Sequence, residues 1–182
     1  GLPSWRLWLA DMEKVAGREI GGFAELCKVL EERIEFFASM GCRASDHAFS
    51  YVPYEEATAD ELEEIFVKVK NGGETNLVET DKFKTALLAF LAAEYAKRDW
   101  GMELHIGPMR NNNTLMFKKI GPDAGFDSID DREIAGKLSR FLDSLAVKEQ
   151  LPRTILFTLN PKDNYVLGTM LGNFQSSEAE SK

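Results

Sequence analysis

Apolar residues recur every three to four positions over much of the chain, and this period predicts helices that bury one face. The clearest stretch runs from Phe23 to Met40, and Gly41 follows as the left-handed stop that ends many helices. The residues at the helical period are Phe23, Leu26, Cys27, Leu30, Ile34, Phe37 and Met40. We therefore expect a helix here with these side chains on its buried face.

Two further helices are predicted before the middle of the chain. Thr58, with Glu61 three positions later, has the form of a capping box for a helix that runs to about Lys70, where Asn71-Gly72-Gly73 ends it. Another helix is expected from about Thr80 to Arg98. Its predicted buried face carries Phe83, Leu87, Phe90, Leu91 and Tyr95.

Short apolar runs predict strands. "MELHI" reads as one strand, and "TILFTL" as another that is apolar enough to be covered on both faces. "CRASDHA" suits a strand end that emerges into a loop. Asp130, followed by Glu133, predicts the start of a helix, and a last short helix is expected to reach about Leu171. The helix after Asp130 is expected to bury Ile134, Leu138, Phe141, Leu142 and Leu145. Strands that alternate with helices predict an α/β fold with a parallel sheet.

Several polar residues fall where such strands end, and in a parallel sheet these ends share one rim. At this rim we expect five residues: Arg6 after "LPSW", Asp46 and His47 after "CRAS", His105 within "ELHIG", and Asn160 after "LFTL". An imidazole beside a carboxylate can act as acid, base or metal ligand near neutral pH. The sequence thus predicts a functional site at this rim.

Each candidate also has a purely structural interpretation. His105 could be a core histidine that donates to a carbonyl, and Asp46 could cap a helix or pair with Arg43. Arg6 could be an ordinary surface residue. Asparagine tolerates left-handed backbone, so the run 111–113 also fits a turn. Neighbouring residues on a strand point to opposite faces, so we do not expect Asp46 and His47 to serve the same site.

Composition narrows the functional classes. The 182 residues are 44% hydrophobic, which is enough for a substantial core, and no phosphate loop, dinucleotide motif or zinc-finger pattern occurs. The net charge of −8 without a basic patch argues against nucleic acid as a partner. No run approaches the ~20 apolar residues of a membrane span, and no signal peptide is apparent, so neither membrane insertion nor secretion is expected. The two cysteines form no metal or disulfide pattern, which fits a cytoplasmic location.

Three long strings carry a resemblance to a known family. They are "GCRASDHA", "ELHIGPMRNNNTLMFKKIGPDAGFDSIDD" and "LPRTILFTLNPKDNYVLGTMLGNFQ". Together they resemble the uronate isomerases, or glucuronate isomerases, of the amidohydrolase superfamily, over Phe23 to Gln175. The resemblance implies a metal-dependent (β/α)8 TIM barrel that interconverts the aldose glucuronate with fructuronate, and galacturonate with tagaturonate. It implies that residues 1–175 form the middle portion of one barrel domain, with about four strands and a helical insertion over about 52–100. The composition of "SSEAESK" separately predicts a polar tail over 176–182.

The same resemblance implies roles for individual residues. Asp46 and His105 would be catalytic, Arg6 would bind the substrate carboxylate, and His105 is also a possible metal ligand. The implied cofactor is a divalent metal, expected to be zinc. The implied partners are a hexuronate substrate and further copies of the chain in a homo-oligomer.

The chain also departs from the family pattern. The family's metal site uses a His-x-His pair on the first barrel strand and an aspartate on the last, and this chain has neither, so we expect it to bind no catalytic metal and to be inactive alone. Leu7 directly follows Arg6 where family members have Pro-Asp-Lys, which predicts either a natural deletion or a missing loop. Two alternatives stay open, namely a metal-dependent hydrolase of the same superfamily and a non-catalytic barrel fragment.

Overall fold

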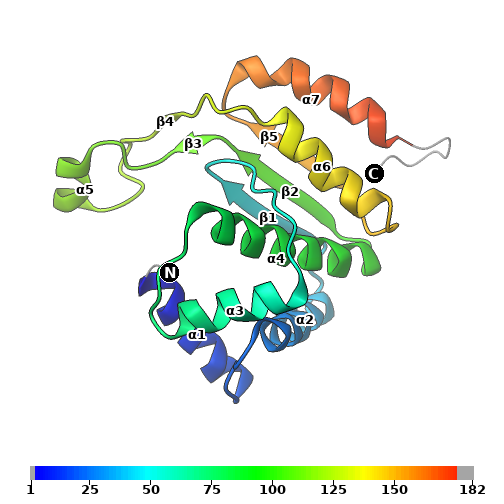
Figure 1. Ribbon diagram of the computed structural model, residues 1–182. Helices are drawn as coiled ribbons and strands as arrows, with labels where there is room; N and C mark the ends of the chain where they lie inside the picture. Colours follow the sequence, from blue (N-terminus) through cyan, green and yellow to red (C-terminus); the bar gives the residue numbers. More distant parts are fainter. Residues whose placement is uncertain (1–2, 176–182) are drawn as a thin grey trace. The chain divides into compact units, whose positions relative to one another are not determined.

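The computed structural model describes residues 3–175, and these fall into two compact units. The helical unit comprises residues 3–42 and 53–94, and the sheet unit comprises residues 43–52 and 95–175. The elements of both are labelled in Figure 1. The predicted polar tail, 176–182, lies outside the described residues.

The helical unit is built from α1 (Pro3–Ala16), α2 (Phe23–Ser39), α3 (Ala59–Lys70) and most of α4 (Leu77–Lys97). Its fully buried cluster consists of Leu9, Ile20, Leu26, Val29 and Phe66. Trp5 packs edge-on against this cluster, since its ring centroid lies 5.6 Å from that of Phe66. The unit therefore has an apolar core of its own.

Local capping signals predicted two of these helices well. The predicted helix over 23–40 is confirmed as α2, and Gly41 has a φ of +92°, as a left-handed stop requires. The capping box is also confirmed, because Thr58 Oγ1 accepts from the Glu61 N–H at 3.2 Å and Glu61 Oε2 accepts from the Thr58 N–H at 2.9 Å. Local chemistry thus sets the C-terminal end of α2 and the start of α3.

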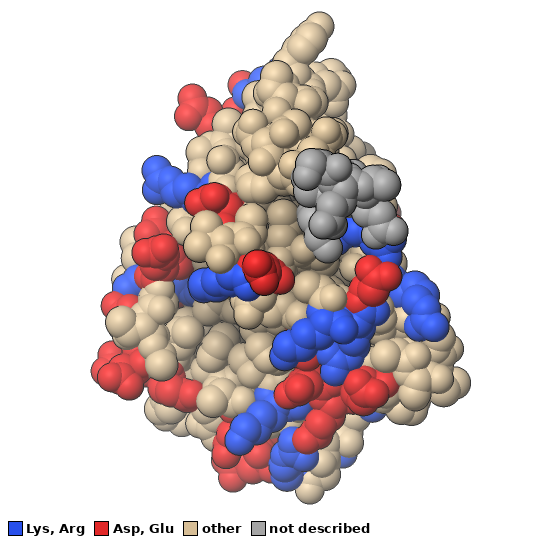
Figure 2. All heavy atoms as spheres, turned by 90° about the vertical axis from the view of Figure 1, so that its right-hand side faces the viewer, with Lys and Arg blue, Asp and Glu red and all other residues tan. Residues whose placement is uncertain are grey.

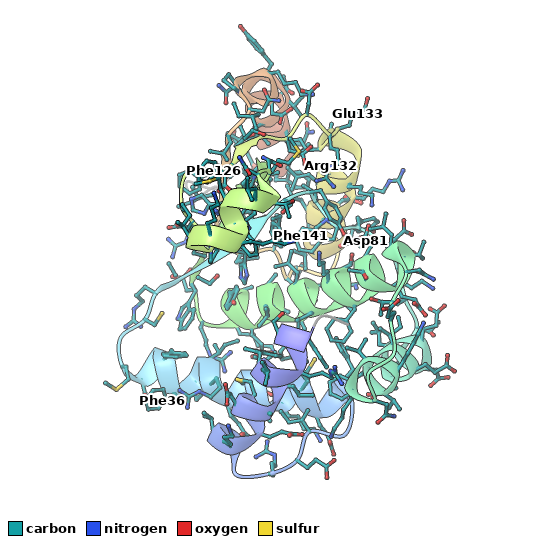
Figure 3. All side chains as sticks on the ribbon, turned by 90° about the vertical axis from the view of Figure 1, so that its left-hand side faces the viewer. Phe36, Asp81, Phe126, Arg132, Glu133 and Phe141 are labelled. Atoms are coloured by element: carbon teal, nitrogen blue, oxygen red, sulfur yellow. The ribbon has the colours of Figure 1, made fainter. Side chains whose placement is uncertain are left out.

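The buried faces of α2 and α4 were predicted less well. Phe37 in α2 and Met40, which follows α2, are 47% and 73% exposed. The Arg33 guanidinium lies over the rings of Phe36 and Phe37; Figure 3 labels Phe36. In α4, only Tyr95 of the five predicted residues is fully buried. The other fully buried positions are Asp81, Thr85, Leu88, Ala92 and Glu94. Apolar residues lie on all sides of α4, so its period could not single out one face.

The start of α1 contradicts the predicted strand before Arg6. Residues Pro3–Ala16 form one continuous helix that includes both Arg6 and Leu7. Pro3, Ser4 and Trp5 of "LPSW" belong to the first turns of this helix, which continues to Ala16, so the strand prediction was wrong. The chain runs through Arg6 and Leu7 without an interruption.

The sheet unit contains three parallel strands in the order β1-β2-β5. These are β1 (Ala44–Phe49), β2 (Gly101–Ile106) and β5 (Thr154–Thr158). The parallel α/β arrangement is confirmed, and so are the strands predicted at "MELHI" and "TILFTL". "CRASDHA" differs from its prediction, because 44–49 form a full strand and Asp46 lies within it rather than after it.

The two faces of this sheet are unequal. One face is covered, and its central residues Met102, Leu104 and Ile106 are at most 2% exposed. The other, which we call the open face, carries Ala44, Asp46, Ala48, Gly101, Glu103, His105, Ile155 and Phe157. Ile155 and Phe157 are 48% and 42% exposed, so β5 is not covered on both faces as predicted. Its apolar character led to the wrong expectation, because an apolar side chain can also lie on an uncovered face.

Helices α6 (Ala135–Ala146) and α7 (Asn164–Leu171) lie beside β2 and β5 in Figure 1. The inward residues predicted for α6 are confirmed, since Ile134, Leu138, Phe141, Leu142 and Leu145 are all at most 5% exposed. The predicted start was wrong. Asp130 accepts from the Arg132 N–H two residues later, in a turn, and α6 begins only at Ala135.

Within the sheet unit, an arm leaves the three-stranded sheet after β2. It contains β3 (Pro108–Met109), α5 (Thr114–Ile120) and β4 (Ser128–Ile129), with β3 and β4 paired antiparallel. The asparagine run builds a turn, as predicted. Asn111 has a left-handed φ of +57°, and Asn113 Oδ1 caps α5 by accepting from the Met116 N–H at 3.1 Å.

Two short 3-10 turns complete the described chain, at Pro161–Asp163 and Gly172–Phe174. Among residues 3–175, no helix is both long and apolar enough to cross a bilayer.

Candidate functional site

The open face brings the two predicted catalytic side chains together. The Nδ1 atom of His105 lies 2.6 Å from Oδ1 of Asp46. The two residues stand on adjacent parallel strands, where Ala48 pairs with His105 and Asp46 pairs with Glu103. They are therefore diagonal neighbours on one face, and the prediction that they lie close together is confirmed.

This contact and the place of Asp46 rule out two of the structural interpretations, the core histidine and the helix cap. His105 bonds a carboxylate, and its side chain is 43% exposed, so it is not a core histidine that donates to a carbonyl. Asp46 lies inside β1 and caps no helix. An ionised carboxylate only accepts hydrogen bonds, so Nδ1 of His105 is the donor and Nε2 is the nitrogen that faces other partners.

A third side chain completes a row across the sheet. Phe157 of β5 pairs in register with His105, and the two rings are stacked with centroids 4.3 Å apart and an interplanar angle of 5°. We call this arrangement the Asp46–His105–Phe157 row. Sequence reasoning did not single out Phe157, although its place in a strand next to a histidine strand could have suggested it.

A carboxylate-oriented imidazole supports two kinds of chemistry. With Nδ1 held by a carboxylate, Nε2 can accept or donate a proton, or bind a metal ion. Asp46 and His105 are both partly exposed, with side-chain exposures of 64% and 43%, so small molecules can reach them. The row thus has the composition of an acid-base or ligand-binding site.

His47 lies on the opposite face from Asp46, as predicted. Its ring stacks on Phe49 with centroids 6.3 Å apart, and it also contacts the Tyr95 ring at 5.8 Å. Its buried Nε2 has no hydrogen-bond partner among the described residues. Burial lowers the pKa of His47, and the nearby charge of Asp46 opposes that shift only in part. His47 is therefore part of the covered side and not of the open-face site.

Arg6 belongs to the helical unit, in the first turns of α1. A Cβ atom added at Gly72 would lie only 3.1 Å from Nη1 of Arg6. The Arg6 guanidinium therefore lies against the turn that ends α3. The strand end predicted for Arg6 is wrong, and its role with substrate stays a prediction.

The loops at the carboxyl ends of the strands are tied together by polar contacts. Asn160, just past β5 as predicted, donates from Nδ2 to the carbonyl oxygen of Asp130 at 3.1 Å. The nearly buried Asp130 carboxylate accepts from Nε of Arg132 at 2.7 Å, and this hydrogen bond holds the pKa of Asp130 below its usual value. The Arg132 guanidinium lies over the Tyr51 ring, 4.9 Å from its centroid. Figure 3 labels Arg132 just before α6. Sequence reasoning missed this ion pair, because it read Asp130 as a helix start.

The described residues do not assemble a metal site by themselves. Across 3–175, no group of three or more His, Cys, Asp or Glu side chains is placed to hold a metal ion, and catalytic zinc uses about three protein ligands. Cys27 is a poor ligand, since burial raises the pKa of its thiol to about 11. His105 can supply at most one ligand, through Nε2, so a complete site would need residues beyond this donor set.

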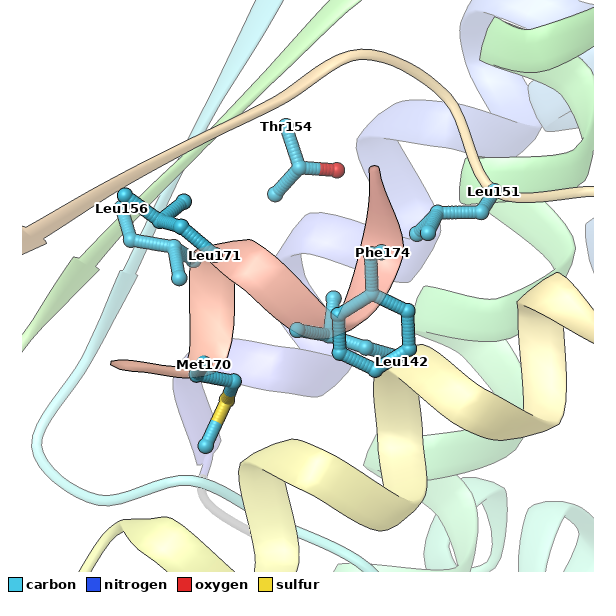
Figure 4. A pocket seen from close by; sticks show the side chains of 7 residues that line it. All are labelled: Leu142, Leu151, Thr154, Leu156, Met170, Leu171 and Phe174. Atoms are coloured by element: carbon cyan, nitrogen blue, oxygen red, sulfur yellow. The ribbon is translucent and has the colours of Figure 1, made fainter. Parts of the chain in front are cut away.

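A small apolar pocket occupies the other side of the sheet unit (Figure 4). It is lined by Leu142, Leu151, Thr154, Leu156, Met170, Leu171 and Phe174. The hydroxyl of Thr154 donates to the carbonyl oxygen of Pro152 at 2.9 Å. Thr154 and Leu156 alternate along β5 with the open-face residues, so this pocket is on the face opposite His105.

Charge is mixed on the molecular surface. Figure 2 shows acidic and basic side chains interspersed over the face that it displays.

Comparison with known proteins identifies relatives over nearly the whole chain. The model of the glucuronate isomerase family matches residues 2–182. A uronate isomerase of Clostridium acetobutylicum is 48% identical over 175 residues, which is 96% of this chain and 38% of that protein. One from Yersinia enterocolitica is 44% identical over 194 aligned positions, covering all of this chain and 41% of that protein. The chain thus spans about two fifths of the length of these relatives.

Solved structures give the same picture of the fold. A uronate isomerase from Thermotoga maritima matches 93% of this chain and 37% of its own, with a TM-score of 0.86 and 24% identity. A glucuronate isomerase from Caulobacter crescentus matches 85% of this chain with a TM-score of 0.75 and 22% identity, over 32% of its own chain.

Proposed function

Because this chain belongs to the glucuronate isomerase family, we propose that its open face serves the active site of a uronate isomerase. The reaction is the aldose-ketose interconversion of D-glucuronate with D-fructuronate and of D-galacturonate with D-tagaturonate. The observation that carries the proposal is the hydrogen bond between His105 Nδ1 and Asp46 Oδ1 on an uncovered sheet face. Such a pair has the acid-base groups that this proton shift needs.

The sheet unit would be part of a (β/α)8 barrel. Strands β1, β2 and β5 are parallel, one face of their sheet is buried, and the other face mixes the apolar Ile155 and Phe157 with the polar Asp46 and His105. A parallel sheet is normally covered on both faces, so this face favours a further layer above it, as the interior of a barrel would provide. The helical segment over 52–100 would then be an insertion in the barrel.

The residues would divide the work by their chemistry. Asp46 orients His105, and His105 Nε2 holds or moves a proton beside the substrate carbons. Arg6 binds the substrate carboxylate, because a planar guanidinium can bond both of its oxygens. His105 Nε2 is alternatively one ligand of a divalent metal, expected to be zinc, and the remaining ligands lie outside the described residues. Bound metal would stabilise negative charge on the substrate oxygens.

The cellular setting of the proposal follows the family. The substrate is a small hexuronate, the enzyme acts in hexuronate breakdown in the cytoplasm, and it assembles from several copies of itself. The exposed Ile155 and Phe157 on the open face, together with the sheet's strand edges, favour association with other protein surfaces.

A metal-dependent hydrolase is the second candidate. The same Asp46–His105 pair could orient a water molecule as readily as it moves a proton. A non-catalytic barrel fragment is the third, and it predicts folding and assembly without turnover.

The test uses a full-length chimera in which this chain replaces the matching segment of the Clostridium acetobutylicum uronate isomerase. The chimera and this chain alone are incubated with glucuronate or galacturonate, with zinc supplied, and the products are followed by proton NMR. Appearance of the ketose with the folded chimera supports the isomerase. A folded chimera that makes no ketose, while the unmodified Clostridium protein does, contradicts it, and release of hydrolysis products from ester or amide substrates would favour the hydrolase.

A further inference from the structure

We infer that Phe157 is a positioning residue, which fixes the plane of the His105 ring while Asp46 fixes the direction of its Nδ1–H bond. The inference rests on the proposed function for its catalytic meaning, but its structural part stands on the row alone. It adds a third residue to the site, from a third strand.

The two contacts restrain different motions of the imidazole. The hydrogen bond to Asp46 lies at the ring edge, with Nδ1 and Oδ1 2.6 Å apart, and it sets where Nδ1 points. The ring could still tilt about that bond. The nearly parallel stack on Phe157, with an interplanar angle of 5° and a centroid distance of 4.3 Å, blocks the tilt on one side. Together they leave Nε2 aimed at one place above the open face.

The backbone explains how the stack arises. His105 and Phe157 are register partners on adjacent parallel strands, so their side chains leave the sheet side by side on the same face. Main-chain hydrogen bonds of the ladder hold both strands. The stack is therefore supported by rigid elements and does not depend on a loop.

The exposure of Phe157 favours this role over a packing role. The covered side of the sheet unit is on the other face, where Met102, Leu104 and Ile106 are buried, whereas Phe157 is 42% exposed. Ile155 lies on the same face of the same strand and is 48% exposed, but it pairs with Glu103 and not with the histidine. Ile155 is thus a matched control for any general effect of trimming this face.

Proton transfer depends steeply on alignment, and a misplacement of about 1 Å can cost about 100-fold in rate. A ring that tilts freely would spend little time with Nε2 in the productive direction. Loss of the stack should therefore lower kcat more than it raises KM, because substrate contacts elsewhere are unchanged.

The first experiment measures the ring itself, in this chain, by NMR of the imidazole. In the wild type and in Phe157→Tyr, the carbon-bound hydrogens of His105 should be shifted upfield by the neighbouring ring, and their relaxation should report a fixed imidazole. In Phe157→Leu both signatures should be lost, while Ile155→Val should keep them. A Phe157→Leu protein that stays folded and still has a rigid His105 ring would overturn the inference, whatever the chemical shifts of that ring.

The second experiment measures turnover in the full-length chimera. Phe157→Leu should lower kcat by about 10-fold to 100-fold with KM changed less than about threefold. Phe157→Tyr should restore most of the loss, and Ile155→Val should have little effect. The double variant Asp46→Asn with Phe157→Leu should lose less than the product of the two single losses, because both act through one ring. Independent, multiplying losses would contradict shared positioning.

The two experiments separate this inference from the proposed function. A folded wild-type chimera without turnover would sink the isomerase, and the His105 ring signals would then decide the inference alone. Turnover in the wild type with no loss in Phe157→Leu would sink the inference and leave the isomerase in place.

Discussion

Charged contacts that tie the helices of the helical unit together differ from the Asp46–His105 pair of the sheet unit. In the helical unit, Glu63 accepts from the N–H groups of Phe23 and Ala24 at 2.8 and 2.9 Å, and so caps the start of α2 from a different helix. Lys70 donates to the carbonyl oxygen of Ile20 at 2.8 Å and pairs with Glu13 and Glu19. These groups tie helices together, and their positions have a structural explanation.

The Asp46–His105 pair of the sheet unit has no such explanation. Both side chains are substantially exposed, and even an exposed ion pair contributes at most about 1 kcal/mol to folding, so this hydrogen-bonded pair adds little stability. The pair also joins two strands that the ladder already holds. A charged pair that joins elements held by little else has a structural role. A charged pair on strands that main-chain hydrogen bonds already join is available for chemistry. The predictions below test that distinction, from the largest expected effect to the smallest.

The largest effect is expected from His105→Ala in the full-length chimera. General acid-base groups contribute about 100-fold to 10,000-fold to rate, so kcat/KM should fall by that order. The thermal midpoint should move by less than about 4 °C, because an exposed pair adds little stability. Turnover assays and thermal unfolding on the same samples check this. A large loss of stability together with a small loss of rate would break the comparison, since the pair would then be structural.

A core substitution in the helical unit should have the opposite profile. Leu26 is fully buried, so Leu26→Ala should lower the free energy of unfolding by about 2–5 kcal/mol. Ile155→Ala on the open face should cost less than about 1 kcal/mol, because Ile155 is 48% exposed. Denaturant titration of this chain measures both. Equal costs would mean that the open face is covered in solution.

Removing the cap supplied by Glu63 should have a smaller effect. In Glu63→Ala, two N–H groups at the start of α2 lose their acceptor, and capping losses are typically about 1 kcal/mol. Glu64→Ala is the matched control, because Glu64 is the exposed neighbour on the same helix. Amide hydrogen exchange should show faster exchange in the first turn of α2 for Glu63→Ala only.

The smallest effect concerns pH and should be confined to the sheet unit, which holds both histidines. Burial lowers the folded-state pKa of His47 below its ordinary value of 6.5, so the unfolded chain binds the proton more readily. The stability that this group contributes is complete above pH 6.5 and declines as the pH falls from 6.5 toward the folded pKa.

Hydrogen exchange of β1 and α2, corrected for intrinsic rates, measures this decline between pH 7 and pH 5. It should appear in β1 and should be absent in His47→Phe. The variant His105→Gln should retain it. A decline of the same size in α2 would show that the acidic groups of the helical unit, and not His47, govern stability in this range.

The sequence by itself determined the features that depend on local chemistry. The capping box of Thr58 and Glu61, the glycine stop at Gly41 and the inward face of α6 all arise from residues a few positions apart, and the structure has each of them. It also predicted that Asp46 and His105 lie close together, because the carboxyl ends of parallel strands share one rim, although the structure places Asp46 within β1.

Only the tertiary structure decided which surfaces are covered and which partners meet. Whether Ile155, Phe37 or Met40 is buried depends on what packs against it, and the apolar character of a side chain does not specify that partner. The same holds for the cap by Glu63 across 39 and 40 residues, and for the stack of Phe157 on His105. Hydrophobic burial has no direction and favours any available partner, so the choice among partners is made only when all the elements pack together.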